Sequence, residues 1–333
     1  MSVTISGTAG VTFNDASTQA TAATGFGFKN RIQNGSMVVD QRNAGASQTI
    51  TAAAALAYTV DRWYGYCTGA NVTGQQVAGS GAVQNRYKFT GAASVTAVGF
   101  GQRIEQKNSY DLAGSTCTLS ADLAISATLT TVTWTAYYAT TTADTFGSLA
   151  SPTVTQIATG TFTVSATVTN FTTNISIPAA ATTGIQILFT VGALTAGLTW
   201  TIGNVQLEKG STATSFDYRP YGTELALCQR YYVQYTATAA QYFVSIGQIA
   251  GTTAAYFVLP LTLRGTPAVA VTGAITLNDA GANPAITSIS SISSTTNNVT
   301  FVVNATGGGL TIGRAAILLS AASGNAITVS SEL

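Results

Sequence analysis

Residues 198–208 read LTWTIGNVQLE, and apolar and polar side chains alternate along them. Such alternation is typical of a β-strand with one buried face. The apolar positions are even-numbered up to Ile202 and odd-numbered from Val205 onward. The stretch therefore predicts a strand with a β-bulge near Gly203, because one extra residue would return the apolar side chains to a single face.

Similar alternating segments recur along the chain, separated by clusters of Gly, Asn, Ser and Thr. Their regular spacing predicts an antiparallel, jelly-roll-like β-sandwich. After residue 232 the pattern starts again, which predicts a second all-β unit of about the minimum size for its own core. The clearest segments of the first unit are TCTLSADLAIS (116–126), TVTWTAYYA (131–139), TGTFTVSATV (159–168) and GIQILFTV (184–191).

The sequence thus predicts an all-β chain in four parts. The N-terminal segment is small, polar and too poor in apolar residues to bury a core, so we expect an anchoring arm that pairs with the sheet edge of another chain, with docking on its own body as the alternative. The predicted parts are the arm at 1–27, the sandwich at 28–221, a junction with a short helical turn at 222–232, and a C-terminal β domain at 233–333.

The region around the junction is unusually rich in charge. Residues 203–232 hold six of the chain's 25 charged residues (13 Lys+Arg plus 12 Asp+Glu). Because opposite charges and tyrosines gather between two apolar units, we expect ion pairs and hydroxyl hydrogen bonds that fix the orientation of the units. The predicted structural residues are Glu208, Asp217, Arg219, Glu224 and Arg230.

Composition excludes several kinds of site. The chain has no histidine, which removes Ser-His-Asp catalysis and imidazole zinc sites, and its net charge of +1 gives no basic stripe for nucleic acid. The N-terminal MSVTISGTAG lacks the pattern of a secretory signal, and no apolar run approaches the ~18 residues of a membrane span. The widely spaced cysteines predict buried, unpaired thiols. We expect no cofactor, and no motif supports a structural calcium ion.

Four segments resemble a pattern shared by structural proteins of tailed-bacteriophage virions, of the tail-fibre, head-fibre or decoration type. VTISGTAGVTFNDASTQATAA (3–23) resembles their N-terminal segments, with Ala16 where that pattern has glycine. The resemblance spans residues 3–232 and implies a carbohydrate-binding-module-like jelly roll. The four segments are NRIQNGSMVVDQRNAG (30–45), YTVDRWYG (58–65), GFGQRIEQ (99–106) and NVQLEKGSTATSFDYRPYGTELALCQRYY (204–232).

The resemblance implies a non-enzymatic virion component that is made in the cytoplasm of a bacterial host and assembles as a homotrimer. It also implies that residues 1–27 contact other virion proteins, and that the protein either attaches to the host surface, where the sandwich would meet glycans, or decorates and stabilises the particle. The alternative is a carbohydrate-binding module of a polysaccharide-degrading system. A glycan-cleaving enzyme is disfavoured because no pair of carboxylates has a distinguishing context. The carboxylates available to such an enzyme are Asp40, Asp61, Glu105, Asp111 and Asp122.

Aromatic side chains are the candidates for glycan contact, because their apolar faces and polar tips suit sugars. They gather in DRWYGY (61–66) and TWTAYYA (133–139). Alternation turns about half of the aromatic residues of a strand toward the core, so a packing role competes with glycan contact at each position. The candidates are Trp63, which we expect in the core, and Tyr64, Tyr66, Trp134, Tyr137 and Tyr138.

Overall fold

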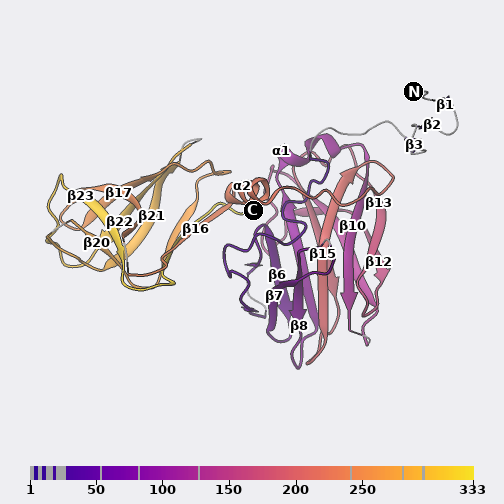
Figure 1. Cartoon of the computed structure of the whole chain (residues 1–333), viewed down its shortest axis with the longest axis horizontal. Helices are drawn as coiled ribbons and strands as arrows, with labels where there is room; N and C mark the ends of the chain where they lie inside the picture. Colours follow the sequence, from indigo (N-terminus) through magenta and orange to yellow (C-terminus); the bar gives the residue numbers. More distant parts are fainter. Residues whose placement is uncertain are drawn as a thin grey trace.

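The computed structural model describes residues 28–333 except 53–54, 82, 127, 241, 280 and 295–296, together with three short N-terminal strands. Figure 1 shows a large β-sandwich and a smaller β domain joined end to end. The predicted all-β fold with a jelly-roll-like sandwich is confirmed. Most of the predicted arm (1–27) lies outside the described residues, so its anchoring role stays a prediction. The N-terminal strands are β1 (Thr4–Ser6), β2 (Gly10–Thr12) and β3 (Thr18–Gln19).

The sandwich consists of two six-stranded antiparallel sheets. Sheet 1 contains β4 (Gln48–Ile50), β7 (Val72–Ala78), β8 (Asn85–Thr90), β10 (Thr116–Ile125), β13 (Thr169–Ser176) and β15 (Thr199–Lys209), in the order β13-β10-β15-β8-β7-β4. Sheet 2 contains β5 (Ala57–Tyr58), β6 (Trp63–Thr68), β9 (Ala97–Ile104), β11 (Thr131–Ala139), β12 (Val154–Thr163) and β14 (Ile185–Val191), in the order β12-β11-β14-β9-β6-β5. The helical turns α1 (Gln106–Ser109) and η1 (Tyr110–Leu112) follow β9.

Alternating side chains of the two sheets fill the core between them. The ring of Trp63 stacks on Phe100 with centroids 4.7 Å apart, and Phe89 stacks on Trp200 at 5.2 Å. The predicted bulge in β15 is confirmed, because its pairing with β10 shifts register beside Gly203. The shift leaves the apolar residues on both sides of it fully buried: Trp200, Ile202, Val205 and Leu207.

The C-terminal domain has two antiparallel sheets and a core of its own, in which Phe257 stacks on Phe301 at 5.4 Å. Sheet 3 contains β16 (Tyr232–Thr236), β19 (Ala268–Thr272) and β24 (Ala326–Ser330), in the order β16-β24-β19. Sheet 4 contains β17 (Tyr242–Gly251), β18 (Ala254–Leu259), β20 (Ile275–Asn278), β21 (Ile286–Ser294), β22 (Val299–Ala305) and β23 (Ala315–Ser320), in the order β20-β23-β17-β18-β22-β21.

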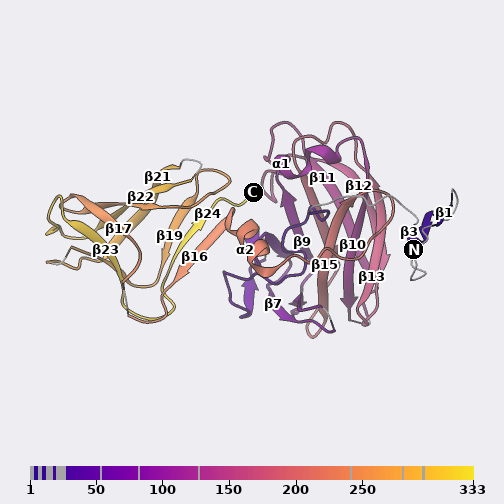
Figure 2. The ribbon, with the colours of Figure 1, turned by 45° about the horizontal axis from the view of Figure 1, so that its top comes forward.

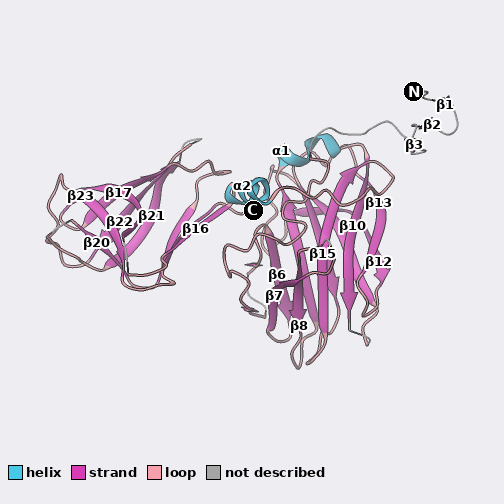
Figure 3. Cartoon of the chain, in the orientation of Figure 1, coloured by secondary structure: helices cyan, strands magenta, loops and turns pink. Residues whose placement is uncertain are grey.

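The chain crosses between the two domains twice at one place. It leaves the sandwich through the helix α2 (Tyr221–Gln229) and returns after β24, and Figure 2 shows α2 beside the C-terminus between the domains. The two crossings touch, because Ser331 N donates a hydrogen bond to Tyr231 O at 2.7 Å. Figure 3 shows strands throughout both domains. Among the described residues, no helix is long and apolar enough to span a membrane.

Candidate functional site

A groove of about 230 Å³ lies on the outer face of sheet 2. Three tyrosines line it: Tyr64 and Tyr66 of β6 and Tyr137 of β11. A second hollow of about 550 Å³ continues from it over the end of β6 and shares Tyr66 with it. The groove and this hollow form one depression across the sheet.

Two glycines of β9 explain how the tyrosines lie. Strand pairing places Tyr66 opposite Gly99 and Tyr64 opposite Gly101. A Cβ at Gly99 would overlap the Tyr66 ring and lie 2.7 Å from its hydroxyl oxygen, and a Cβ at Gly101 would lie 2.5 Å from the Tyr64 hydroxyl. Both rings therefore lie against the backbone of β9, and the GFG at 99–101 shapes the floor of the groove.

The buried Arg103 is part of the groove lining. The Nε of Arg103 donates to Gln186 Oε1 at 3.0 Å, its Nη2 to Gly147 O at 2.8 Å, and its Nη1 to the backbone oxygen of Leu333 at 2.9 Å. Its guanidinium carbon lies 5.5 Å from the centroid of the Tyr64 ring. Three fixed acceptors hold the side chain, so it presents its charge in one orientation. Sequence reasoning missed Arg103 and Gln186 as site residues.

The wall of the groove is the loop between β11 and β12. Phe146, Leu149 and Pro152 face the groove from this loop. Backbone hydrogen bonds within the loop brace it, including Thr153 N to Phe146 O at 3.1 Å. Together with the bond from Arg103, these contacts hold the wall over the floor.

The described lining of the groove carries one charged side chain, that of Arg103. Burial raises the pKa of Tyr64 and of Tyr66, so both hydroxyls are neutral at pH 7 and can donate or accept a hydrogen bond. Among the described residues that line the groove, none is a carboxylic acid. The groove therefore offers the partly exposed rings of Tyr66 and Tyr137, whereas Tyr64 and Arg103 are buried behind its surface, and its described lining has no group placed for acid–base cleavage.

The structure separates the six aromatic candidates. Tyr64, Tyr66 and Tyr137 line the groove, whereas Trp63 and Trp134 belong to the core. Trp63 is fully buried and donates from Nε1 to Asn34 O at 3.0 Å. Tyr138 is partly buried and packs against the same core. Glycan contact by Tyr66 and Tyr137 stays a prediction, whereas Tyr64, at 2% exposed, has no more ring face at the surface than Trp63 (0%) and Trp134 (6%).

The carboxylates considered for catalysis each make structural contacts. Their partners are Asn43 N (3.1 Å) for Asp40, Arg42 (3.1 Å) for Asp61, Arg230 (2.9 Å) for Glu105, Arg31 (2.7 Å) for Asp111, and Asn204 (3.0 Å) for Asp122. Burial raises the pKa of Asp61 from 3.8 to about 6, against the opposing effect of Arg42.

The charged residues predicted for the junction lie along the path into α2. Arg219 pairs with Glu224 at 3.3 Å and also donates to the backbone oxygens of Asn30 and Ile32. Glu224 accepts a hydrogen bond from Asn34 N. These contacts attach α2 to the loop at 30–34. The others act nearby: Asp217 accepts from Asn30 N at 3.3 Å, Glu208 from Thr214 N at 2.8 Å, and Arg230 binds Glu105.

A second ion-pair group, which sequence reasoning missed, joins the end of the chain to the sandwich. The carboxylate of Glu332 binds the guanidinium of the fully buried Arg62 and that of Arg42, the latter at 3.1 Å. Arg42 also lies over the ring of Tyr232, and Arg62 over that of Tyr231, at 3.6 and 3.5 Å from the centroids. The four segments that carry the sequence resemblance thus converge on one buried junction.

The described part of the chain has no cluster of metal-ligating side chains. No group of three or more His, Cys, Asp or Glu side chains there could hold an ion. The cysteines are buried and unpaired, as predicted.

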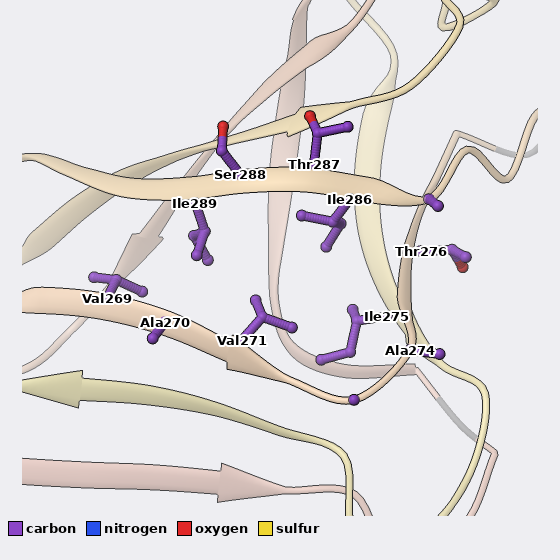
Figure 4. Close-up of a pocket in the computed structure, with 12 residues that line it drawn as sticks. Val269, Ala270, Val271, Ala274, Ile275, Thr276, Ile286, Thr287, Ser288 and Ile289 are labelled. Carbon is purple, nitrogen blue, oxygen red and sulfur yellow. The ribbon is translucent and has the colours of Figure 1, made fainter.

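A further hollow, of about 440 Å³, lies in the C-terminal domain between β19 and β21 (Figure 4). These strands are edge strands of sheets 3 and 4, and the hollow is the open side of the core between them. In Figure 4, Val269, Val271 and Ile275 face Ile286 and Ile289 across the gap. The described residues that line this slot include no charged or aromatic side chain, so it lacks the features of the sandwich groove.

Comparisons with known proteins give no family. No protein-family model and no curated protein matches the chain. A CBM4 structure matches at 17% identity and a TM-score of 0.30, covering 54% of this chain and 99% of that one. A family 16 carbohydrate-binding module matches at 18% identity and a TM-score of 0.28, covering 40% and 84%. The enzymatically active domain of tailspike protein 4 from bacteriophage CBA120 matches at 15% identity and a TM-score of 0.32, covering 55% of this chain and 22% of that one. TM-scores this low do not assign a function to this chain.

Proposed function

We propose that the sandwich binds a glycan in the groove on sheet 2. The observation that carries this proposal is the placement of Tyr64 and Tyr66 against Gly99 and Gly101. It leaves the Tyr66 ring partly exposed in the groove, with the buried Tyr64 and Arg103 next to it in the lining. Sugar rings present apolar C–H faces and polar edges, and binding sites for small ligands commonly combine apolar walls with a few placed polar groups.

The proposed activity is binding without cleavage. Hydrolysis of a glycosidic bond usually needs two carboxyl groups about 5–10 Å apart on either side of the scissile bond. The described groove lining has no carboxylate, and the acids elsewhere in the sandwich are engaged in structural contacts.

The test is a glycan screen of the full-length protein, followed by calorimetric titration with the best ligand. Tyr66→Ala and Tyr137→Ala should each weaken binding by about 1–2 kcal/mol, or roughly 5- to 30-fold. Tyr110→Ala is the matched control, because Tyr110 is 60% exposed and is not among the residues that line the groove. Binding that survives both groove substitutions would overturn the proposal.

We also propose that the protein is a bacteriophage virion component of the fibre or decoration type, made in the host cytoplasm and assembled as a homotrimer. Residues 1–27 would contact other virion proteins, and the groove would meet host-surface glycans. The convergence of the four resembling segments on one buried junction supports this proposal, because it gives the shared pattern a single structural role.

The rival proposal is a carbohydrate-binding module of a polysaccharide-degrading system, which would use the same groove as a monomer. Light scattering of the full-length protein and of a variant without residues 1–25 separates the two. A trimer that is lost on truncation supports the virion proposal. A monomer in both cases, together with binding to a polysaccharide, supports the rival.

A further inference from the structure

The strand β13 is an edge of the sandwich that lacks the usual protection of an edge. Proteins normally shorten exposed edge strands, bulge them or give them charges, because their free N–H and C=O groups would otherwise pair with another strand. Of the other three edges, β4 has three residues, β5 has two, and β12 shifts register against β11. The strand β13 has eight residues, all paired with β10 in unbroken register, and it contains no proline. It is therefore a long and regular edge.

The free side of β13 carries no charge of its own. The chain has no charged residue between Asp144 and Glu208. Asp122 lies opposite Asn170 and accepts a hydrogen bond from its amide, but it belongs to β10, on the paired side of β13. Among the described residues, no group outside the pairing with β10 bonds the backbone of β13. About half of its backbone N–H and C=O groups are therefore free to pair with an added strand.

The predicted arm joins the sandwich beside one end of this strand. Lys29, which follows the arm, donates a hydrogen bond from Nζ to Thr214 Oγ1 at 2.6 Å. Asn174, near the C-terminal end of β13, donates from Nδ2 to Ser211 O at 2.9 Å. Ser211 and Thr214 belong to one short loop, which thus contacts both Lys29 and β13. The arm therefore leaves the sandwich near the C-terminal end of β13.

We propose that the arm of a neighbouring copy, residues 1–27, adds a strand to β13; this inference rests on the homotrimer proposed above. The arm suits the edge in composition, because it is rich in Thr, Ala and Ser, and Asp15 is its one charged side chain. Threonines that face each other across paired strands stabilise the pairing. The arm is also long enough: 27 residues span up to about 90 Å, whereas a strand of eight residues spans about 26 Å.

Chain direction favours a neighbouring copy over the arm's own sandwich. The arm ends near the C-terminal end of β13, so an arm strand that lay on its own β13 and led straight into Phe28 would run parallel to β13. All strand pairs of sheet 1 are antiparallel, and parallel pairing is slightly less stable per residue. The arm of another copy can approach β13 in the antiparallel direction.

Symmetry distinguishes the arm from a second β13 as the occupant of the edge. Two β13 strands that paired with each other would make a two-fold contact, which closes as a dimer. An arm that pairs with the β13 of the next copy makes a head-to-tail contact, and three such contacts can close a ring. Pairing of the arm with β13 is therefore the contact that agrees with a homotrimer.

The test is photo-crosslinking of the full-length protein, with benzoylphenylalanine in place of the exposed Thr172 of β13. This protein is unfolded in urea together with ¹⁵N-labelled wild type and refolded, and native mass spectrometry checks that mixed trimers form. We expect cross-linked peptides in which position 172 is joined to ¹⁵N-labelled residues of 1–27, and thus to the arm of another copy. The same group in place of the exposed Thr161 of β12 is the matched control, and it should not reach the arm.

A charge at the same edge tests the energy of the contact. A lysine on an edge strand opposes pairing, so in Thr172→Lys the concentration at which half of the protein is trimeric should rise at least about tenfold. Thr161→Lys adds the same charge to β12 and should leave that concentration unchanged. If Thr172→Lys does not fold, Thr169→Lys makes the change at another exposed position of β13.

The other outcomes separate this inference from the homotrimer. Cross-links from position 172 to the arm of the same copy, or to β13 of another copy, would overturn the inference and leave the trimer standing. A trimer in which position 172 joins no residue of the arm would do the same. A protein that stays monomeric would overturn both. Glycan binding in the groove is measured separately, so its success or failure decides neither.

Discussion

Replacing Glu332 by Gln should loosen the attachment of the C-terminal domain to the sandwich. The carboxylate of Glu332 is buried between the guanidinium groups of Arg62 and Arg42. Arg62 is itself only 1% exposed, so its charge cannot turn to water when the counter-charge is removed. The substitution keeps the shape of the side chain and an acceptor oxygen, and it removes only the negative charge.

The expected loss follows from what Arg62 retains. Breaking a buried ion pair by removing one partner costs about 3–5 kcal/mol, because the remaining charge is left uncompensated. Arg62 keeps its hydrogen bonds to Gln33 Oε1 at 2.9 Å and to Arg103 O at 2.7 Å, and its position over the ring of Tyr231. We therefore expect a loss near the lower end, about 3 kcal/mol.

Urea unfolding of the full-length protein measures this loss. The tryptophans are all in the sandwich (Trp63, Trp134 and Trp200), so their fluorescence reports on that domain, whereas far-UV circular dichroism reports on both. In the wild type the two signals should change together. In Glu332→Gln the dichroism should begin to change at a lower urea concentration than the fluorescence.

Two further variants sharpen this test. Asp111→Asn removes a carboxylate from an ion pair of 2.7 Å with Arg31 that is well exposed, and it should cost less than about 1 kcal/mol. Arg62→Met combined with Glu332→Met removes both buried charges and should recover part of the loss. A Glu332→Gln variant no less stable than Asp111→Asn would refute the reasoning.

Three other predictions concern the groove and the junction. Gly99→Ala should displace the Tyr66 ring and weaken glycan binding, while changing the free energy of unfolding by less than about 1 kcal/mol because alanine suits a strand better than glycine. Gly192→Ala is its control, because a Cβ there meets no atom within 4 Å. Equal glycan affinities of the two variants would contradict the proposed floor. Because the pKa of Asp61 rises from 3.8 unfolded to about 6 folded, the folded state holds an extra proton between these values, and the free energy of unfolding should fall as pH rises through that window. The fall should reach about 3 kcal/mol and disappear in Asp61→Asn, so a slope unchanged by that substitution would count against it. Arg219→Ala should lower the melting temperature more than it lowers glycan affinity, and the reverse ranking would make the junction a binding site.

Local pattern was enough to predict the strands, the bulge at Gly203 and the burial of the cysteines, because each depends on residues close in sequence. The groove depends on register between distant strands. The expected burial of Trp63 already turns Tyr64 and Tyr66 to the outer face, because successive side chains of a strand alternate. The segment DRWYGY does not show that Gly101 and Gly99 lie opposite these tyrosines and leave room for their rings.

Long-range polar pairs were equally beyond the reach of local pattern. Arg103 donates hydrogen bonds to Gln186 and Leu333, which lie 83 and 230 residues away in the sequence. Glu332 lies in an otherwise ordinary terminal segment, and only the return of β24 to the junction brings it to Arg62. The resembling segments indicated which residues matter there, and the three-dimensional fold was needed to pair them.

The double crossing between the domains has a mechanical consequence. A single linker would let the C-terminal domain swivel, and a pull would act on that linker alone. Here the segments at Tyr231 and Ser331 are bonded side by side, and each is anchored to the sandwich by its own neighbours, Arg230 and Glu332. Force or torque applied to the C-terminal domain would act on both linking segments at once, so the contacts of both would have to break before the domain could move relative to the sandwich.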